Sequence, residues 1–306
     1  MFYNRVLPLF FIALGILVMP FFSHTAESAG LSISPLNFEL TANPGDRLPN
    51  AIKIFNTSDG AQVVRITVED FAPVGETGQV ALTEDTNYTF SLAKWVTFTP
   101  IEFLLEAGQL QIVEFNVDVP EDAEPGGHYA SILATVGGQS EGGSGIAQKI
   151  GALLLLQVAG EVKEEMKVVS MDAPDFSEYG PVIISTRFQN TGSVHLKPRG
   201  FISVRNMFGT EVAKLNLDQK NVLPDSIRKI DAEFNGDFLF GKYTATMTAI
   251  YGSKNEPLSY STSFWIIPWK ITAGVGIGTL FLVSLLFLAR RRIGLAFKIL
   301  FKGEHK

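Results

Sequence analysis

The 306-residue chain contains no cysteine. Its fold therefore cannot rest on disulfides, zinc–thiolate sites or a cysteine nucleophile, and a packed core must stabilise it. Histidine is also scarce, because residues 29–268 hold just His128 and His195, 67 positions apart. A two-histidine metal site or a Ser-His-Asp triad inside one domain would need an unusual geometry. We predict that the protein is not an enzyme and has no metal and no other cofactor.

Basic side chains are few in the first half of the chain. Residues 29–160 hold five Lys or Arg and sixteen Asp or Glu, whereas residues 161–269 hold twelve and thirteen. An acidic surface of this kind repels nucleic acid and other anionic polymers unless divalent cations bridge them. We therefore predict no nucleic-acid partner.

Charge is absent from Ile271 to Leu288. Eighteen helical residues cover about 27 Å, close to the roughly 30 Å hydrocarbon core of a bilayer, so we predict a transmembrane helix at 269–289. A buried core helix is the alternative. The membrane anchors at the two interfaces are Trp269 and Lys270 on one side and Arg290, Arg291 and Arg292 on the other. Because positive charge favours the cytoplasmic side, residues 290–306 are predicted to be a basic cytoplasmic tail.

The N-terminus carries a second apolar run, from Val6 to Phe22, after the basic Arg5 and before the small-residue pair Ala26 and Ser28. This arrangement predicts a signal peptide over residues 1–28, with an uncleaved anchor as the alternative. Residues between the two apolar runs are then exported. We expect a single-pass protein of the cell membrane whose N-terminal domains are extracytoplasmic.

Helical periodicity is missing between residues 31 and 268, where short alternating segments are separated by Pro, Gly, Asn and Asp. This pattern is typical of β-sandwiches. We predict an all-β fold with two tandem immunoglobulin-like β-sandwich domains, the acidic first one at 29–162 and the second at 163–268. The apolar run from Gly151 to Gln157 is too short for a bilayer and is predicted to be a buried strand of the first domain.

The two halves share an internal repeat. Phe55-Asn56-Thr57-Ser58 is echoed by Phe188-Gln189-Asn190-Thr191-Gly192, and the segment at Tyr129 is echoed at Tyr243. Each Tyr is expected to pin a corner of its sandwich through a hydroxyl that bonds to backbone. The first copy has about twenty extra residues, which we place between Pro73 and Pro100.

Short segments with turn and strand signals recur along the chain. They are Ser34-Pro35, Asn43-Pro44-Gly45, Phe55-Asn56-Thr57 and Ile146–Leu156 in the first half, and Phe188–Thr191, Leu223–Ser226 and Phe240–Tyr243 in the second. Through these segments the chain resembles the WxL-interacting proteins of Gram-positive cell surfaces. The resemblance implies a peptidoglycan-binding domain, a host-binding domain and one membrane helix. A weaker resemblance, through 95–100 and the strand after Gly108, links the first half to the N-terminal domain of pilus chaperones.

We predict a membrane-anchored binding or scaffolding protein that contacts a cell-wall polymer or another surface protein. The alternative is a chaperone-like assembly factor for exported subunits, with Gln111–Val119 as its exposed edge strand. In the insertion, Tyr88 and Trp95 are the candidate binding residues, and Trp95 also suits a core position. Gly274 and Gly278 form a GxxxG pair, which makes a homodimer through the membrane helix possible.

Overall fold

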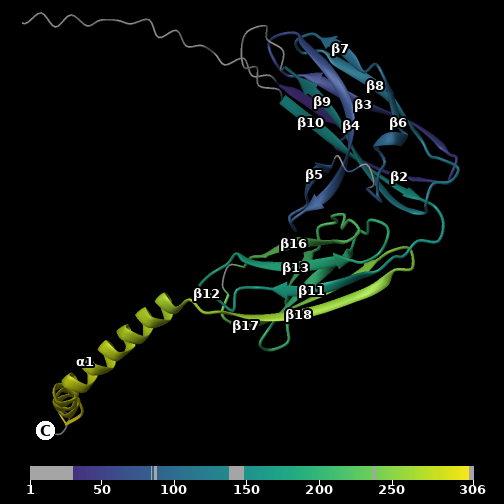
Figure 1. Ribbon diagram of the computed structural model, residues 1–306. Helices are drawn as coiled ribbons and strands as arrows, with labels where there is room; N and C mark the ends of the chain where they lie inside the picture. The colour runs from purple at the N-terminus through teal and green to yellow at the C-terminus, as the bar shows by residue number, and fades with distance from the viewer. Residues whose placement is uncertain (1–29, 84, 86–87, 138–147, 237–238, 303–306) are drawn as a thin grey trace, which may run out of the picture.

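In the computed structural model, the described residues are 30–83, 85, 88–137, 148–236 and 239–302, and residues 291–302 are described as backbone alone. The predicted signal peptide lies outside the described residues, as do the side chains of Arg291 and Arg292. Within the described part, two β-sandwiches are followed by one long helix (Figure 1). The predicted all-β fold of two immunoglobulin-like sandwiches with a C-terminal apolar helix is thereby confirmed.

The first sandwich is built from two facing sheets. One sheet has the strand order β1-β3-β8-β6, and the other has the order β2-β10-β9-β4-β5, with β7 paired to the start of β4. The strands are β1 (Leu31–Ser34), β2 (Asn37–Ala42), β3 (Arg47–Asn56), β4 (Gln62–Val74), β5 (Gln79–Thr83), β6 (Val96–Thr99), β7 (Glu102–Leu105), β8 (Leu110–Asp118), β9 (Gly126–Val136) and β10 (Gln148–Val158), with a short 3₁₀ turn at Ala93–Trp95.

The second sandwich has a three-stranded sheet, β11-β13-β16, and a five-stranded sheet, β12-β18-β17-β14-β15. Its strands are β11 (Met166–Asp172), β12 (Phe176–Ser177), β13 (Val182–Asn190), β14 (Arg199–Asn206), β15 (Glu211–Asn216), β16 (Ser226–Phe234), β17 (Gly241–Tyr251) and β18 (Glu256–Ile266). Each sandwich encloses its own apolar core, formed by alternate residues of the facing strands.

The first strand of the chain is divided. The sequence pattern predicts one strand from Ser32 to Thr41, but the structure has β1 in one sheet and β2 in the other. Pro35 stands between them, and a proline has no N–H to donate to a strand ladder. The chain therefore leaves β3 after Ser34, and β2 pairs in parallel with β10 from Asn37 onward.

The apolar run at 151–157 forms most of β10, as predicted, and β10 pairs with β9 along its whole length. Leu154 and Leu156 point into the core of the first sandwich. Leu153 and Leu155 point to the opposite face of the sheet, where they join a separate apolar cluster with a residue of the second sandwich. Both faces of β10 are therefore covered, which explains why the run does not alternate with polar residues.

The internal repeat is visible in the hydrogen bonds of Asn56 and Asn190, both fully buried. The Nδ2 of Asn56 donates to the carbonyls of Gly60 and Leu105, and its Oδ1 accepts from the backbone N–H of Ser58. The Nδ2 of Asn190 donates in the same way to Val194 and Val222, and its Oδ1 accepts from Gly192. Intervals of 49 and 32 residues separate each Asn from its distant carbonyl, so the first copy is 17 residues longer here.

The two repeated tyrosines behave differently. The Tyr243 hydroxyl accepts from the backbone N–H of Phe240 at 3.1 Å, as expected for a residue that pins a corner. The Tyr129 hydroxyl instead lies 3.3 Å from Nδ1 of His195, which belongs to the second sandwich. The prediction is thus correct for Tyr243 and wrong for Tyr129, because the partner that this buried ring reaches comes from the neighbouring domain.

Helix α1 (Trp269–Lys302) begins two residues after β18 ends. Its segment Trp269–Arg290 is long and apolar enough to cross a membrane, and none of it is buried against the rest of the described chain. Lys270 forms an ion pair of 2.9 Å with Glu178, which ties the start of the helix to the second sandwich. Gly274 and Gly278 have open space where a Cβ would stand. Contact between two such helices through these glycines stays a prediction.

Candidate functional site

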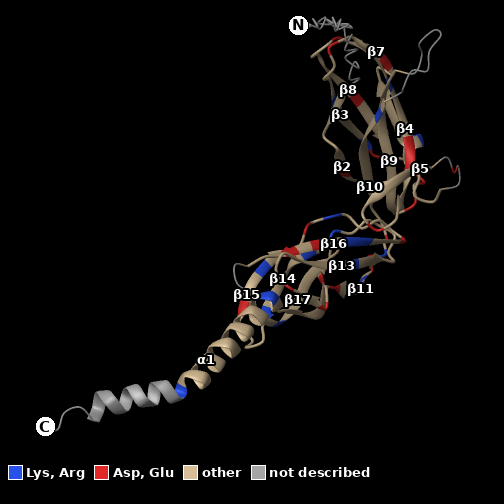
Figure 2. Ribbon diagram, turned by 90° about the vertical axis from the view of Figure 1, so that its left-hand side faces the viewer, with Lys and Arg blue, Asp and Glu red and all other residues tan. Residues whose placement is uncertain are grey.

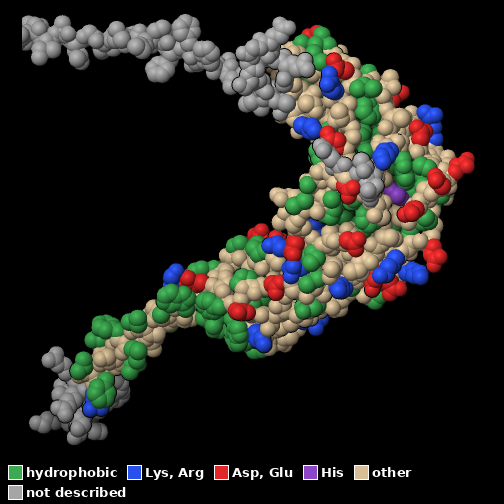
Figure 3. All heavy atoms as spheres, in the orientation of Figure 1, with side chains coloured by type: hydrophobic (Ala, Val, Ile, Leu, Met, Phe, Trp, Pro, Cys, Tyr) green, Lys and Arg blue, Asp and Glu red, His purple; other side chains and the backbone are tan. Residues whose placement is uncertain are grey.

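A cavity of about 460 Å³ is lined by residues of both sandwiches, which meet at a bend in the outline of the molecule (Figure 3). We call it the interdomain cleft. Phe71, Leu153 and Leu155 line it from the first sandwich, and Leu223 and Arg228 line it from the second. Its wall is thus partly apolar and partly cationic. Cavities with this lining at domain boundaries are common sites for ligands and for segments of partner proteins.

The apolar side of the cleft belongs to a small interdomain cluster. Phe71, Tyr129, Leu155 and Leu223 are all buried and in mutual contact, and the first three come from three adjacent strands of one sheet. The backbone N–H of Gly127 also donates to the carbonyl of a second-sandwich residue, at 2.8 Å. This packing holds the two sandwiches together at the closed side of the cleft.

A first polar clasp joins β2 to the second sandwich. Glu39 accepts from Nζ of Lys197 at 2.7 and 2.9 Å and from Nδ2 of Asn221 at 2.8 Å. Burial raises the pKa of the Glu39 carboxyl, but the hydrogen bonds from Lys197 and Asn221 outweigh it and hold the pKa below its ordinary value. The carboxylate form of Glu39 is therefore the one that bridges the domains.

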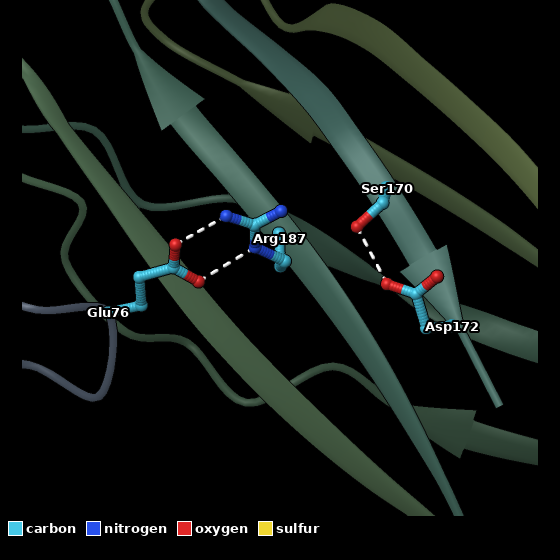
Figure 4. Close-up of polar contacts among 4 residues, drawn as sticks. All are labelled: Glu76, Ser170, Asp172 and Arg187. Carbon is cyan, nitrogen blue, oxygen red and sulfur yellow. Dashed lines mark hydrogen bonds and ion pairs between the residues drawn. The ribbon is translucent and has the colours of Figure 1, made fainter. Parts of the chain in front are cut away.

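A second clasp is formed by the turn between β4 and β5. Arg187 on β13 holds the Glu76 carboxylate with two nitrogens, one of them Nε at 2.7 Å (Figure 4). The backbone carbonyl of Glu76 accepts from the N–H of Lys229, which is the register partner of Arg187 on β16. In Figure 2, part of the ribbon of β16, the strand that receives this turn, has the blue of Lys and Arg. The hydrogen bonds from Arg187 lower the pKa of Glu76, so the ion pair is formed at neutral pH.

Arg228 supplies the cationic wall of the cleft. Its guanidinium lies against the backbone of Gly78, where an added Cβ would stand 1.4 Å from Nη1. Its Nε is buried and has no hydrogen-bond partner within the described part of the chain, and burial lowers the pKa of the guanidinium. A buried donor without a partner is costly, so this wall is suited to receive a carboxylate or a carbonyl oxygen.

The predicted binding residues lie beside this interface rather than on a free loop. Tyr88 is half-buried, and its ring meets Phe90 edge-on at 5.7 Å. Burial, with smaller effects from Asp70 and Asp225, raises the pKa of the Tyr88 hydroxyl to about 12. The backbone carbonyl of Phe90 accepts from the N–H of Tyr129 at 2.8 Å, so this part of the insertion supports the interdomain cluster.

Trp95 is also half-buried and packs against the core of the first sandwich. Its ring lies 4.4 Å from that of His128, whose two ring nitrogens each lie 3.0 Å from a backbone carbonyl. This environment fits the core alternative for Trp95. Ligand binding by Tyr88 and Trp95 stays a prediction.

The two histidines belong to different sandwiches. His195 is half-buried, and burial lowers the pKa of its imidazole. Within the described residues, no three His, Cys, Asp or Glu side chains lie close enough together to hold a metal ion. The interdomain cluster was missed by sequence reasoning. A signal for it did exist, since the leucine run of β10 is apolar on both faces although the strand has one core to fill.

The expected edge strand, Gln111–Val119, is an edge in its first half alone. β8 pairs with β3 along its whole length, and residues 114–117 also pair with β6, so the second half of β8 is internal. The inserted segment supplies β6, in line with the inward-packing alternative for Trp95. A second open edge lies on β10, where residues 148–152 pair with β9 but with no other described strand. This edge ends at Leu153, which lines the interdomain cleft.

No family model and no curated protein matches the chain. Solved structures do resemble it. The YadV chaperone is 12% identical, with a TM-score of 0.40, over 76% of this chain and 99% of that chain. The class 5 fimbriae chaperone CfaA is 14% identical, with a TM-score of 0.39, over 76% and 99%. The CsuC–CsuE chaperone–tip adhesion subunit complex of Acinetobacter baumannii is 13% identical, with a TM-score of 0.37, over 76% and 98%.

The chaperones in these structures belong to the class of pilus chaperones, to which the sequence shows its weaker resemblance. The resemblance to WxL-interacting proteins finds no support in any of the comparisons.

Proposed function

We propose that this chain is a membrane-tethered assembly factor that holds an extended segment of another exported protein. The backbone of that segment pairs with the open edge of β10, and its end enters the interdomain cleft. The proposal rests on one observation: the open edge of β10 at 148–152 continues directly into Leu153, which lines the cleft. Addition of a strand to an exposed sheet edge is a general mode of peptide recognition.

The lining of the cleft defines the kind of segment that fits. Leu155 and Leu223 offer an apolar surface, and Arg228 offers an unsatisfied donor at Nε. We expect a segment with apolar side chains and a carboxylate or a carbonyl oxygen directed at Arg228. An anionic wall polymer is a poorer occupant, because the first sandwich carries a strong excess of acidic residues.

Helix α1 provides the tether in this proposal. Its apolar segment is long enough to span a bilayer, and the basic residues that follow it favour the cytoplasmic side for the tail. The two sandwiches then stand outside the cell membrane. There they can meet other exported proteins soon after export.

Site-specific photo-cross-linking on intact cells tests the proposal. A photoreactive phenylalanine analogue replaces Lys149 on the β10 edge or Gln219 at the cleft, and the matched control replaces Ser259, an exposed residue on β18. We expect the same exported protein to be captured from positions 149 and 219 and not from 259. Arg228→Gln should reduce the capture at position 219. Equal capture from all three positions, or from none, would contradict the proposal.

A further inference from the structure

An apolar surface surrounds the point where α1 leaves the second sandwich. Four strands of one sheet, β12, β18, β17 and β14, have ends side by side here: Phe176 is paired with Trp265, Gly241 with Ile266, and Asn206 with Tyr243. Large apolar side chains extend outward from this end of the sheet. They are Phe176, Tyr179, Met207, Phe208, Phe240 and Trp265, with exposed fractions between 45% and 81%. We call this set the basal patch (Figure 3).

The sheet brings the backbones of the basal patch residues close together. Neighbouring strands lie about 4.8 Å apart, so the row from β12 to β14 spans roughly 15 Å. Met207 bridges two of these strand ends, because its side chain lies against Gly241, where an added Cβ would stand 2.5 Å from Cε. Single exposed apolar residues are ordinary on a protein surface, but a contiguous group of large ones marks a surface that contacts something else.

The position of α1 identifies the occupant. Trp265 precedes Trp269 by four residues, which extend over at most about 14 Å. The Lys270–Glu178 ion pair also holds the helix start against the segment that carries Phe176 and Tyr179. Any bilayer that α1 crosses therefore lies within reach of the basal patch.

We infer that the basal patch docks on the lipid headgroup region of the membrane that α1 spans, and that this contact orients the second sandwich. The inference rests on the membrane tether of the proposed function. Its chemistry is that of the membrane interface, where Trp and Tyr place an apolar ring and a polar group at headgroup level. Lys242, the exposed register partner of Trp265, supplies a cation for lipid phosphates.

The three tryptophans of the chain allow a direct test, because Trp95 lies in the first sandwich, Trp265 in the basal patch and Trp269 at the helix start. The full-length chain is reconstituted in phosphatidylcholine–phosphatidylglycerol vesicles that contain a headgroup spin-labelled lipid. Variants that retain one Trp, with Phe at the other two positions, report quenching at each site. We expect strong quenching of Trp265 and Trp269 and none of Trp95.

The outcomes separate docking from tethering. Quenching of Trp269 without quenching of Trp265 overturns the docking and leaves the tether intact, and an absence of quenching at Trp269 overturns both. Phe208→Ser should reduce the quenching of Trp265, whereas Leu104→Ser, at an exposed apolar site of the first sandwich, should not. If Phe208→Cys forms cross-links between copies while Trp265 stays unquenched, a second copy covers the patch and the inference is wrong.

Discussion

The buried asparagine of the second sandwich offers a sharp test of how the fold is stabilised. Asn190 is fully buried and makes three hydrogen bonds of 2.8 to 2.9 Å with backbone groups of the neighbouring loops. Asn190→Ala leaves the Val194 carbonyl and the Gly192 N–H without this partner, whereas the Val222 carbonyl still accepts from the N–H of Leu196. Each orphaned buried group costs about 1 to 3 kcal/mol, so we expect a loss of at least about 2 kcal/mol. At roughly 4 °C per kcal/mol for a domain of about 100 residues, the Tm of this sandwich falls by about 8 °C.

Near-ultraviolet circular dichroism of the full-length chain in detergent measures the melting, and hydrogen exchange locates it. Peptides from β13 and β16 should exchange faster in Asn190→Ala, while those from β3 and β8 keep their protection. Asn56→Ala should give the reverse pattern, since Asn56 holds the equivalent position in the first sandwich. Asn216→Ala is the matched control, because Asn216 is exposed on β15. A shift below about 3 °C for Asn190→Ala, less than about 1 kcal/mol, would show that these bonds do not pin the loops.

Three further predictions concern the interface between the sandwiches. Because the pKa of Glu76 is lowered in the folded chain, its clasp contributes to stability above pH 4.5, the ordinary pKa of a glutamate, and this contribution is lost as the pH falls through the folded pKa. Small-angle scattering should then show the domains separating. Glu76→Gln should show the open form already at pH 7. Ultraviolet titration should show a tyrosine transition near pH 12 that Tyr88→Phe removes. Gly78→Ala should lower the Tm more than Gly75→Ala, because both glycines have positive φ but the Cβ added at Gly78 alone collides with Arg228.

Sequence patterns were sufficient for the features that depend on local physics. The alternation of strands predicts two sandwiches, and the repeated asparagines mark equivalent buried positions with equivalent hydrogen bonds. The apolar run from Ile271 to Leu288 is long and uncharged, which predicts a membrane helix, and the helix found there is not buried against the rest of the described chain. These features follow from side-chain periodicity and from the need to satisfy buried polar groups.

Features that depend on which surfaces meet were not predictable in the same way. Glu76 and Arg187 are 111 residues apart, and no periodicity connects a turn in one sandwich with a strand in the other. The insertion was expected to carry the candidate binding residues Tyr88 and Trp95, with a core position as the alternative for Trp95, and the structure uses it to cover half of β8 with β6 and to support Tyr129 through Phe90. A pattern can show that a strand is apolar on both faces. It does not show which domain covers the second face.

The interface and the basal patch together determine what the cleft can reach. Lys197 in the cleft wall lies two residues from Arg199, and Arg199 pairs with Ile250 on β17. Ile250 is nine residues along β17 from Gly241, which lies at the basal end of that strand. Nine residues of strand measure about 30 Å. If the basal patch rests on the membrane, the two clasps hold the cleft at about this height above the lipid. Its occupant is then a segment of a protein outside the membrane, because a lipid headgroup cannot reach it.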